Sequence, residues 1–382
     1  MVGSSAESDA AGGATQGNSS VLNSSPSNRP DGAASGATGP YSAAGLQARQ
    51  EQLALWRARY DRAEQTYASY RDATRYPHES RPMSEHPDQV RPFAPITEEL
   101  KLLNNKGEPI KGVRLRTSQE RVFLSGSDTV RFAIQAVDEN NLPLPLTVRN
   151  ASARTIADAG APVTLIQASL SFTDNGSGAD DTAGDSNYTA RLSPAAQGFE
   201  RYNGTIRTLA EVTANGQQGM VQFDVIYTPD IPATWGSVRE AVEAGSLNFY
   251  LKLNVRIPGR YVVSGRVDDA NGVPFAFVQY NEELTAGVRE VRLQVFGALI
   301  RDKSPAFPLR LRDVDGFLLI PDTFPDRAML ARQPGVIYTS ARYAQDRFSP
   351  NEWTSEERER YLTEYGKDAE TARQQVQDLT PK

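Results

Sequence analysis

The chain has 382 residues, which predicts two or three domains, since a domain usually holds ~100–200 residues. Its 41 Lys and Arg and 47 Asp and Glu give a formal charge of −6, and they are interspersed from Glu98 to Arg332 without the one-signed stripe that a nucleic-acid partner requires. The lack of Cys excludes disulfides, Cys-ligated metals and thiol nucleophiles, and no run approaches the ~20 apolar residues of a membrane-spanning helix.

Residues 1–44 are predicted to form a disordered tether. Of the first 40 residues, 26 are Gly, Ala, Ser or Asn and none is aromatic, so the segment cannot bury enough apolar surface to offset the entropy of ordering. No signal peptide is visible after Met1. Tethers of this kind often follow a cleaved signal or a lipid-anchored Cys in exported bacterial proteins. We therefore expect an extracytoplasmic protein, periplasmic, cell-surface or secreted, and lipoprotein-like.

Residues 45–76 are predicted to form one amphipathic helix, because apolar residues recur at spacings of three and four. The shared face consists of Leu46, Leu53, Trp56, Tyr60, Ala63, Tyr67 and Tyr70. We expect this face to dock on the chain's own β-domain, since a helix gains most of its stability from packing. The alternative is a homo-oligomer or a partner protein bound through this helix, with Trp56, Tyr60 and Tyr67 as the contact residues.

Residues 77–97 contain five prolines, which predicts an extended strap, because Pro is excluded from helix interiors and central strands. The only two histidines, His78 and His86, lie in this strap with Glu79, Glu85 and Asp88. Imidazole and carboxylate groups together can bind zinc or move a proton, so a hydrolase that uses them is one alternative function. The spacing argues against it, because two His eight residues apart in an extended segment point in unrelated directions.

From residue 98 to 257 the hydrophobic pattern has a period of two, which is typical of antiparallel strands with one wet face. The clearest run is 247–255, and Asn-Gly turn signals occur at 175–176, 203–204 and 215–216. Short strands separated by frequent turns predict an all-β fold, an Ig-like β-sandwich over 98–257.

Residues 258–321 repeat this pattern and predict a second, smaller sandwich in tandem with the first. Because some 65 residues fall short of the ~100 of a full sandwich, the pattern leaves two alternatives open, a core shared with the first sandwich and an independent fold. Residues 322–382 are predicted to be an irregular tail that ends in a helix over 355–377. A capping box from Thr354 to Glu357 marks the start of that helix, which we expect to pack weakly.

The loop that follows Phe172 gathers oxygen donors between flexible glycines. The donors are Asp174, Asn175, Asp180, Asp181, Asp185 and Asn187. Calcium takes 6–8 oxygen ligands, so the loop is a candidate Ca²⁺ site, although its spacing is not that of an EF-hand. Asp, Asn and Gly are also ordinary turn formers, so a hairpin bonded to its own backbone is the alternative. No other cofactor is indicated.

The run Asp174-Asn-Gly-x-Gly-Ala-Asp-x-x-Ala-Gly-Asp-x-x-Tyr188 resembles the signature loop of bacterial exported Ig-like proteins of the choice-of-anchor X group. The motifs Arg75-Tyr-Pro-x-x-Ser-Arg-Pro82, Gly259-Arg-Tyr-x-Val-x-Gly265 and Val291-x-Leu-x-Val-Phe-Gly297 are similar to further segments of that group. The group includes secreted tandem Ig-like proteins without an assigned function, so the resemblance implies fold and export but no activity. Ser186 stands where the group usually has Gly.

Three functions follow from these patterns. The leading one is a non-enzymatic exported β-sandwich protein that binds a protein or carbohydrate partner, or presents a surface, at the bacterial envelope. It is favoured because the chain has neither a Gly-x-Ser-x-Gly elbow nor a phosphate-binding glycine loop. Trp235 joins the helix aromatics as a candidate contact residue. The second is a Ca²⁺-dependent carbohydrate-binding accessory module, and the third is the hydrolase.

Overall fold

The computed structural model describes residues 43–103, 108–157 and 165–380, so nearly all of the predicted tether lies outside the described residues. The chain divides into two compact units. One unit combines the residues up to 63 with those from 368 onward, and the other comprises residues 64–367. The larger unit contains all the strands.

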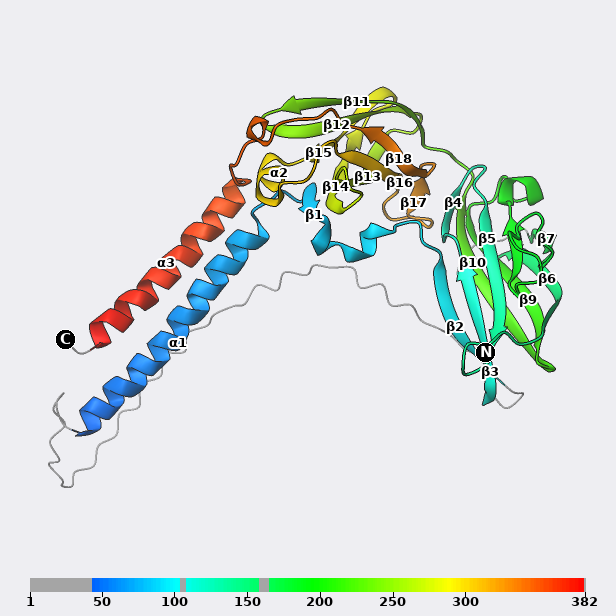
Figure 1. Ribbon diagram of the computed structural model, residues 1–382, viewed down its shortest axis with the longest axis horizontal. Coiled ribbons are helices and arrows are strands. Elements are labelled where there is room, and N and C mark those ends of the chain that lie inside the picture. The colour runs from blue at the N-terminus through cyan, green and yellow to red at the C-terminus, as the bar shows by residue number, and fades with distance from the viewer. Residues whose placement is uncertain (1–42, 104–107, 158–164, 381–382) are drawn as a thin grey trace. The chain divides into compact units, whose positions relative to one another are not determined.

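Residues 96–228, called here the first sandwich, form two sheets (Figure 1). One sheet has the order β2-β3-β5-β8 and the other β4-β10-β9-β6-β7, with only the β4–β10 pair parallel among the described strands. Phe132 and Phe223 stack between the sheets with ring centroids 4.5 Å apart. The strands are β2 (Ile96–Leu103), β3 (Pro109–Gln119), β4 (Phe123–Ser125), β5 (Val130–Val137), β6 (Leu146–Thr155), β7 (Gln167–Leu170), β8 (Tyr188–Leu192), β9 (Gly204–Ala214) and β10 (Gln217–Thr228).

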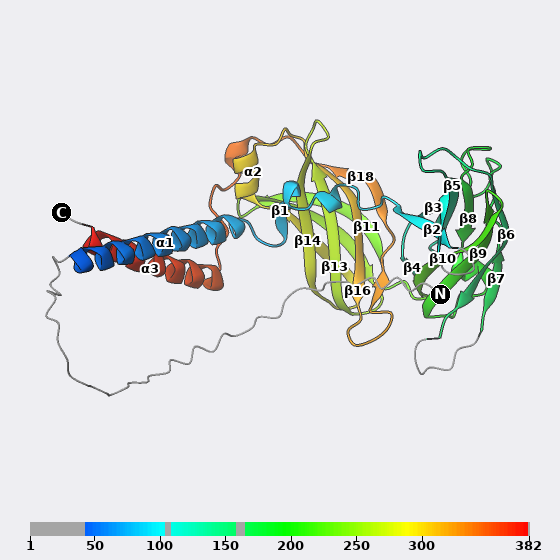
Figure 2. The same cartoon turned by 90° about the horizontal axis from the view of Figure 1, so that it is seen from below.

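A second sandwich is built from one strand of the strap and from residues 233–339. Its larger sheet has the order β1-β14-β13-β16-β17 with β18 also on β16 (Figure 2), and its smaller sheet is β11-β12-β15 (Figure 1). The strands are β1 (Ser80–Pro82), β11 (Ala233–Glu243), β12 (Ser246–Val255), β13 (Gly259–Asp268), β14 (Pro274–Leu284), β15 (Gly287–Val295), β16 (Arg310–Leu319), β17 (Arg327–Met329) and β18 (Gln333–Thr339). A short helix, α2 (Gly297–Lys303), follows β15. The predicted all-β class with tandem sandwiches is confirmed.

The boundary between the sandwiches differs from the predicted one between residues 257 and 258. The run 247–255 does form a strand, but β12 pairs with β11 and β15, and its buried side chains belong to the second core. Each sandwich has its own hydrophobic core, so of the two alternatives the described residues show separate cores and not a shared one. The physical reason is that a period of two identifies a strand with one buried face but not the sheet that it joins.

The strap, predicted to be an extended connection, and the tail, predicted to be irregular, also contribute to the second sandwich. β1 pairs with β14 and forms one edge of the larger sheet, a position that tolerates Pro82 because an edge strand needs fewer backbone donors. Ser80 is fully buried, and its Oγ accepts a hydrogen bond of 2.8 Å from the backbone N–H of Phe296. Two short 3₁₀ turns, Met83–Glu85 and Pro87–Val90, follow β1. The tail supplies β17 and β18 before its helix begins.

The two long helices, α1 (Ala43–Ala73) and α3 (Glu356–Leu379), lie side by side (Figures 1 and 2). In the smaller unit, Arg49 Nε donates to the carbonyl of Leu379 at 3.0 Å. In the larger unit, the ring of Tyr70 meets those of Tyr361 and Tyr365 edge-on, at 5.6 and 5.3 Å. The partner of the aromatic face is therefore α3, and not the β-domain surface expected from the sequence.

The start of α3 is capped one residue later than predicted. Ser355 Oγ accepts the backbone N–H of Arg358 at 3.1 Å, and the neighbouring Thr354 hydroxyl donates to Glu359 at 2.5 Å. Ala369 and Ala372 are buried, so α3 is more closely packed than expected. Neither α1 nor α3 is long and apolar enough to cross a membrane, and the same holds for every helix in the part of the chain that the structure describes.

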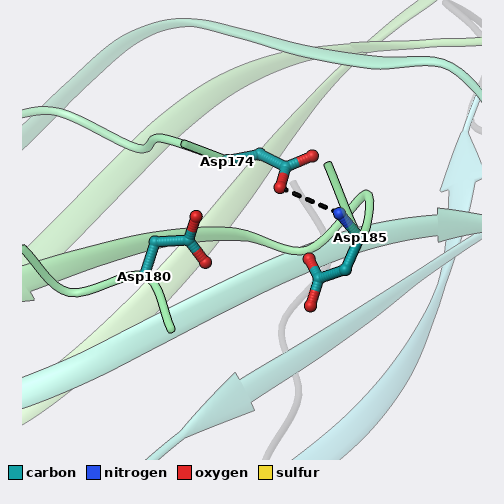
Figure 3. Close-up of side chains that lie close together, drawn as sticks. All are labelled: Asp174, Asp180 and Asp185. Carbon is teal, nitrogen blue, oxygen red and sulfur yellow. Dashed lines mark hydrogen bonds between the residues drawn. The ribbon is translucent and has the colours of Figure 1, made fainter. Parts of the chain in front are cut away.

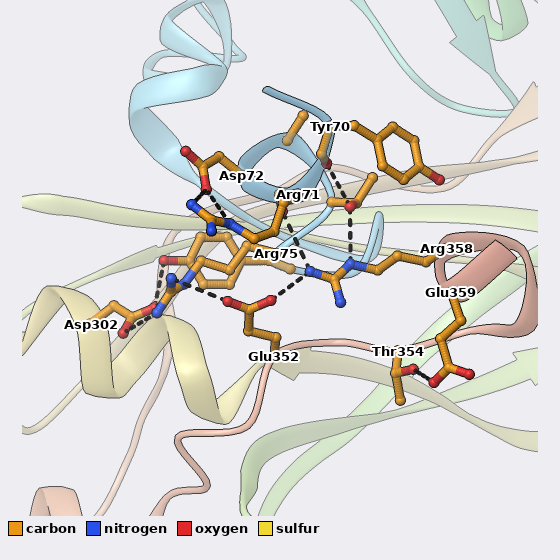
Figure 4. Close-up of polar contacts among 12 residues, drawn as sticks. Tyr70, Arg71, Asp72, Arg75, Asp302, Glu352, Thr354, Arg358 and Glu359 are labelled. Carbon is orange, nitrogen blue, oxygen red and sulfur yellow. Dashed lines mark hydrogen bonds and ion pairs between the residues drawn. The ribbon is translucent and has the colours of Figure 1, made fainter. Parts of the chain in front are cut away.

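A polar network joins the end of α1, the start of α3 and helix α2 within the larger unit (Figure 4). Arg75 makes two hydrogen bonds to Asp302, at 2.7 and 3.0 Å, and an ion pair of 3.4 Å to Glu352. The Tyr76 hydroxyl also donates to Asp302 at 2.9 Å, and burial together with this bond raises the pKa of Tyr76 to about 12. Glu352 in turn pairs with the buried Arg358.

Candidate functional site

The predicted calcium loop lies between β7 and β8, and it brings three of its six predicted ligands together (Figure 3). Asp174, Asp180 and Asp185 each offer a carboxylate oxygen, and these oxygens lie within 4.8 Å of one another. Among the described residues, this is the one group of three or more His, Cys, Asp or Glu with such a geometry.

The carboxylates in this cluster also accept hydrogen bonds from the backbone of the loop. Asp174 accepts the N–H groups of Gly184, Asp185 and Ser186 at 2.7, 3.1 and 3.0 Å. Asp180 accepts those of Gly176 and Thr182 at 2.6 and 3.4 Å. The backbone donors, led by Gly176, hold the pKa of Asp180 below its usual value despite its burial. The loop is thus closed by its own hydrogen bonds.

The other three predicted ligands have separate roles. The Asn175 side chain accepts the N–H of Ser177 at 3.1 Å in a local turn, and the exposed Asp181 pairs with Arg131 of β5. The backbone N–H of Asn187 donates to the Asp185 carboxylate at 2.9 Å. Ser186, at the position where the resembling proteins usually have Gly, adopts a left-handed conformation with φ of 64°.

Replacing Asp174 by Ala is expected to loosen the loop, because three backbone N–H groups lose their acceptor. Hydrogen bonds to charged groups contribute ~1.5–3 kcal/mol each, but water can replace part of this in a half-exposed loop, so we expect a total loss of about 2 kcal/mol. Hydrogen exchange at residues 174–188 measures the effect. Asp181→Ala is the matched control, since its exposed ion pair with Arg131 is worth under ~1 kcal/mol. Equal exchange in the two variants would contradict the prediction.

Calcium binding at this loop stays a prediction. It implies that millimolar CaCl2 raises the melting temperature of the full chain above its value in chelator, since an ion bound only by the folded state stabilises that state. It also implies that Asp180→Asn removes the difference. Identical melting curves for the wild-type chain in calcium and in chelator would contradict calcium binding and favour the alternative, a loop closed by its own hydrogen bonds.

The two histidines contact different aromatic residues. His78 is exposed, with its ring 6.4 Å from that of Trp353. His86 packs against Phe277 of β14 with ring centroids 4.8 Å apart. Neither belongs to a group of three potential metal ligands in the described residues. The geometry therefore gives no support to a zinc or hydrolase site in the strap.

The aromatic residues predicted to bind a partner take part in packing within the chain. Trp235 is half-buried on the second core, and its indole N–H donates to the carbonyl of Ala331 at 2.7 Å. On α1, Trp56 and Tyr60 are partly buried, and Tyr67 lies against Gly366 of α3. Their role in binding another molecule stays a prediction.

A polar groove of about 320 Å³ on the outer face of the sheet β2-β3-β5-β8 was missed from the sequence. Its floor includes Thr97, Ser118 and Ala133, and the acidic loop contributes Asp185 and Asn187 to its lining. The outward positions of β3 and β5 can be inferred from their alternation. The strand register, which places the short side chains of neighbouring strands next to one another, cannot be inferred from the residues of each strand.

No protein-family model and no curated protein matches the chain. Among solved structures, it is similar to a DUF4785 family protein from Legionella pneumophila, with 12% identity, 62% of each chain covered and a TM-score of 0.39. It is also similar to the adhesin InvE from Yersinia pseudotuberculosis, with 13% identity, 57% of each chain covered and a TM-score of 0.18. The chain thus spans less than two thirds of either structure, and likenesses of this order carry no conclusion about function.

Proposed function

We propose that the protein is a non-enzymatic binding protein that holds a partner at the bacterial envelope. The observation that carries this proposal is the polar groove, because it gathers side chains with free hydrogen-bonding capacity on a rigid sheet face. Regular strands position such groups more accurately than loops do. A binding role is further supported by the surroundings of the two histidines, which contact different aromatic residues and belong to no cluster of three potential metal ligands in the described residues.

An extracytoplasmic location is part of the same proposal. Its support is the Gly-, Ala- and Ser-rich composition of residues 1–44 and the resemblance to the choice-of-anchor X group. Two motifs of that resemblance meet in the fold, since Ser80 of the strap bonds to Phe296 of the later module at 2.8 Å. Membership of that group stays a proposal.

The test uses the full chain, labelled with a fluorophore, and isolated envelope fractions from a bacterium that encodes it. We expect saturable binding that the unlabelled chain displaces, with the bound material unchanged in mass after long incubation. Binding that does not saturate, or cleavage of the bound material, would contradict the proposal. Cleavage that survives in a His78→Ala, His86→Ala double variant would further point to a carboxylate hydrolase.

A second candidate is a Ca²⁺-dependent carbohydrate-binding module. The observation in its favour is that Asp185 belongs both to the carboxylate cluster and to the lining of the groove. An ion among the carboxylates would fix the loop at the end of the groove. This candidate predicts that chelator abolishes binding to the envelope fractions, whereas calcium-independent binding would remove it.

A further inference from the structure

The groove runs across the strands because three short side chains line up on neighbouring strands. In the sheet register, Thr97 of β2 pairs with Ser118 of β3, and Ser118 pairs with Ala133 of β5. Neighbouring strands are ~4.8 Å apart, so this row forms a floor about 10 Å long. Ala133 is only 9% exposed although it faces outward, because the longer side chains around it stand higher.

Longer side chains on both sides of this row form the walls. One wall consists of Arg116 and Gln135, which are register partners and lie two residues along their strands from Ser118 and Ala133. Glu120 and Arg131 form the other wall, where the Glu120 carboxylate also accepts the backbone N–H of Arg131 at 3.2 Å. Side chains two residues apart on one strand are separated by ~6.6 Å, so each wall stands about that far from the floor row.

The charges in the groove cancel. Its lining holds two guanidinium groups, Arg116 and Arg131, and two carboxylates, Glu120 and Asp185. Each Arg also has an acidic partner outside the lining, Glu99 for Arg116 at 2.9 Å and Asp181 for Arg131. A site without net positive charge gives an anion no advantage over a neutral ligand.

The uncharged side chains have hydrogen-bonding groups to spare. The groove is lined by the hydroxyls of Thr97 and Ser118 and the amides of Gln135 and Asn187, and within the described part of the chain these groups make no hydrogen bond. Hydroxyls and amides both donate and accept, so the groove offers mixed donors and acceptors at fixed spacings. That pattern suits a ligand with many hydroxyl groups, each of which also donates and accepts.

We propose that this groove binds a neutral oligosaccharide laid across β2, β3 and β5. The inference rests on the proposed binding function and names its ligand class. The volume of about 320 Å³ lies near the lower end of ligand sites, roughly 300–1,000 Å³, so the groove takes a short stretch of a glycan chain. The walls supply the charged hydrogen bonds, and the short floor side chains let a sugar ring approach the sheet.

The test is an array of neutral oligosaccharides, with uronic-acid oligosaccharides as the acidic arm, probed with the full chain and followed by calorimetry on the best ligand. We expect neutral glycans to bind with and without calcium. Ser118→Trp fills the floor and is expected to weaken binding at least tenfold. Gln135→Ala removes one wall amide without adding bulk and is expected to weaken binding several-fold.

The matched control is Thr147→Trp, which places the same bulk on an exposed position of β6 in the opposite sheet. It is expected to bind as the wild type does. Absence of binding to every neutral glycan, binding to uronic acids alone, or undiminished binding by both groove variants would overturn the inference. If the envelope fractions still bind the chain saturably after their glycans are removed, the proposed function stands while this inference fails.

Discussion

Replacing Arg266 by Ala is expected to cost the second sandwich about 3 kcal/mol of its free energy of unfolding, because the change leaves buried acceptors without a donor. Arg266 in β13 is 2% exposed. Its guanidinium donates to the Asp313 carbonyl and to the Asp315 carboxylate at 2.7 Å each, and to the Gln89 side chain. This loss of unfolding free energy lies at the low end of the ~3–5 kcal/mol expected for a broken buried ion pair. The reason is that the Asp315 side chain is 27% exposed and remains partly hydrated.

Two further variants separate the polar contribution of Arg266 from its packing. Arg266→Met keeps most of the volume against Phe277, whose ring centroid lies 5.3 Å from the guanidinium carbon, so it should recover part of the loss. Arg260→Ala, on the same strand but exposed, is the matched control, with an expected change within ~0.5 kcal/mol. Thermal and urea unfolding measure all three. Similar stabilities for Arg266→Ala and Arg260→Ala would show that the buried network contributes little.

Replacing Arg358 by Ala is expected to loosen the junction between α1 and α3 by about 2–3 kcal/mol. Arg358 is 6% exposed, pairs with Glu352, and donates to the Thr74 hydroxyl at 3.0 Å and to the Arg71 carbonyl at 3.4 Å (Figure 4). Without it, the carbonyl end of α1 and the Glu352 carboxylate lose their shared donor.

The measurement is hydrogen exchange at residues 70–75 and 355–362, where protection should fall more than in the sandwiches. Arg360→Ala is the matched control on the same helix, because its side chain is 56% exposed and its Glu356 partner is 84% exposed. Such surface pairs contribute ~0.3–0.5 kcal/mol. If Arg360→Ala lowered protection as much as Arg358→Ala, the buried network would not be what holds the junction.

Local sequence patterns predicted the elements well but not how they assemble. The alternating run 247–255 predicts the strand β12, and the aromatic spacing predicts α1, because burial of one face leaves a period in the sequence. The same pattern did not indicate that β12 belongs with β15, or that Tyr70 would meet Tyr361 and Tyr365. Those pairings are decided between segments far apart in the chain.

The candidate sites show the same limit. The acidic loop could be located because Asp, Asn and Gly are close in sequence, and its self-bonded form was among the alternatives. The groove could not be located from the sequence. Thr97, Ser118 and Ala133 are ordinary strand residues, and only the register of three strands places them side by side on the groove floor. The sequence also does not show whether Trp235 contacts a partner or covers the core. The structure adds the hydrogen bond from its indole N–H to the carbonyl of Ala331.

The order of pairing in the fold also bears on how the protein is made. The first sandwich can fold once residue 228 has left the ribosome, whereas the second needs residues as late as 339. Helix α1 can pair with α3 only after residue 356, where α3 begins. At ~5–20 residues per second, α1 emerges roughly 15–60 s before its partner helix. Throughout that interval Tyr67 and Tyr70 lack the α3 residues that they contact in the folded protein, so the pairing of the two helices comes after both sandwiches can close.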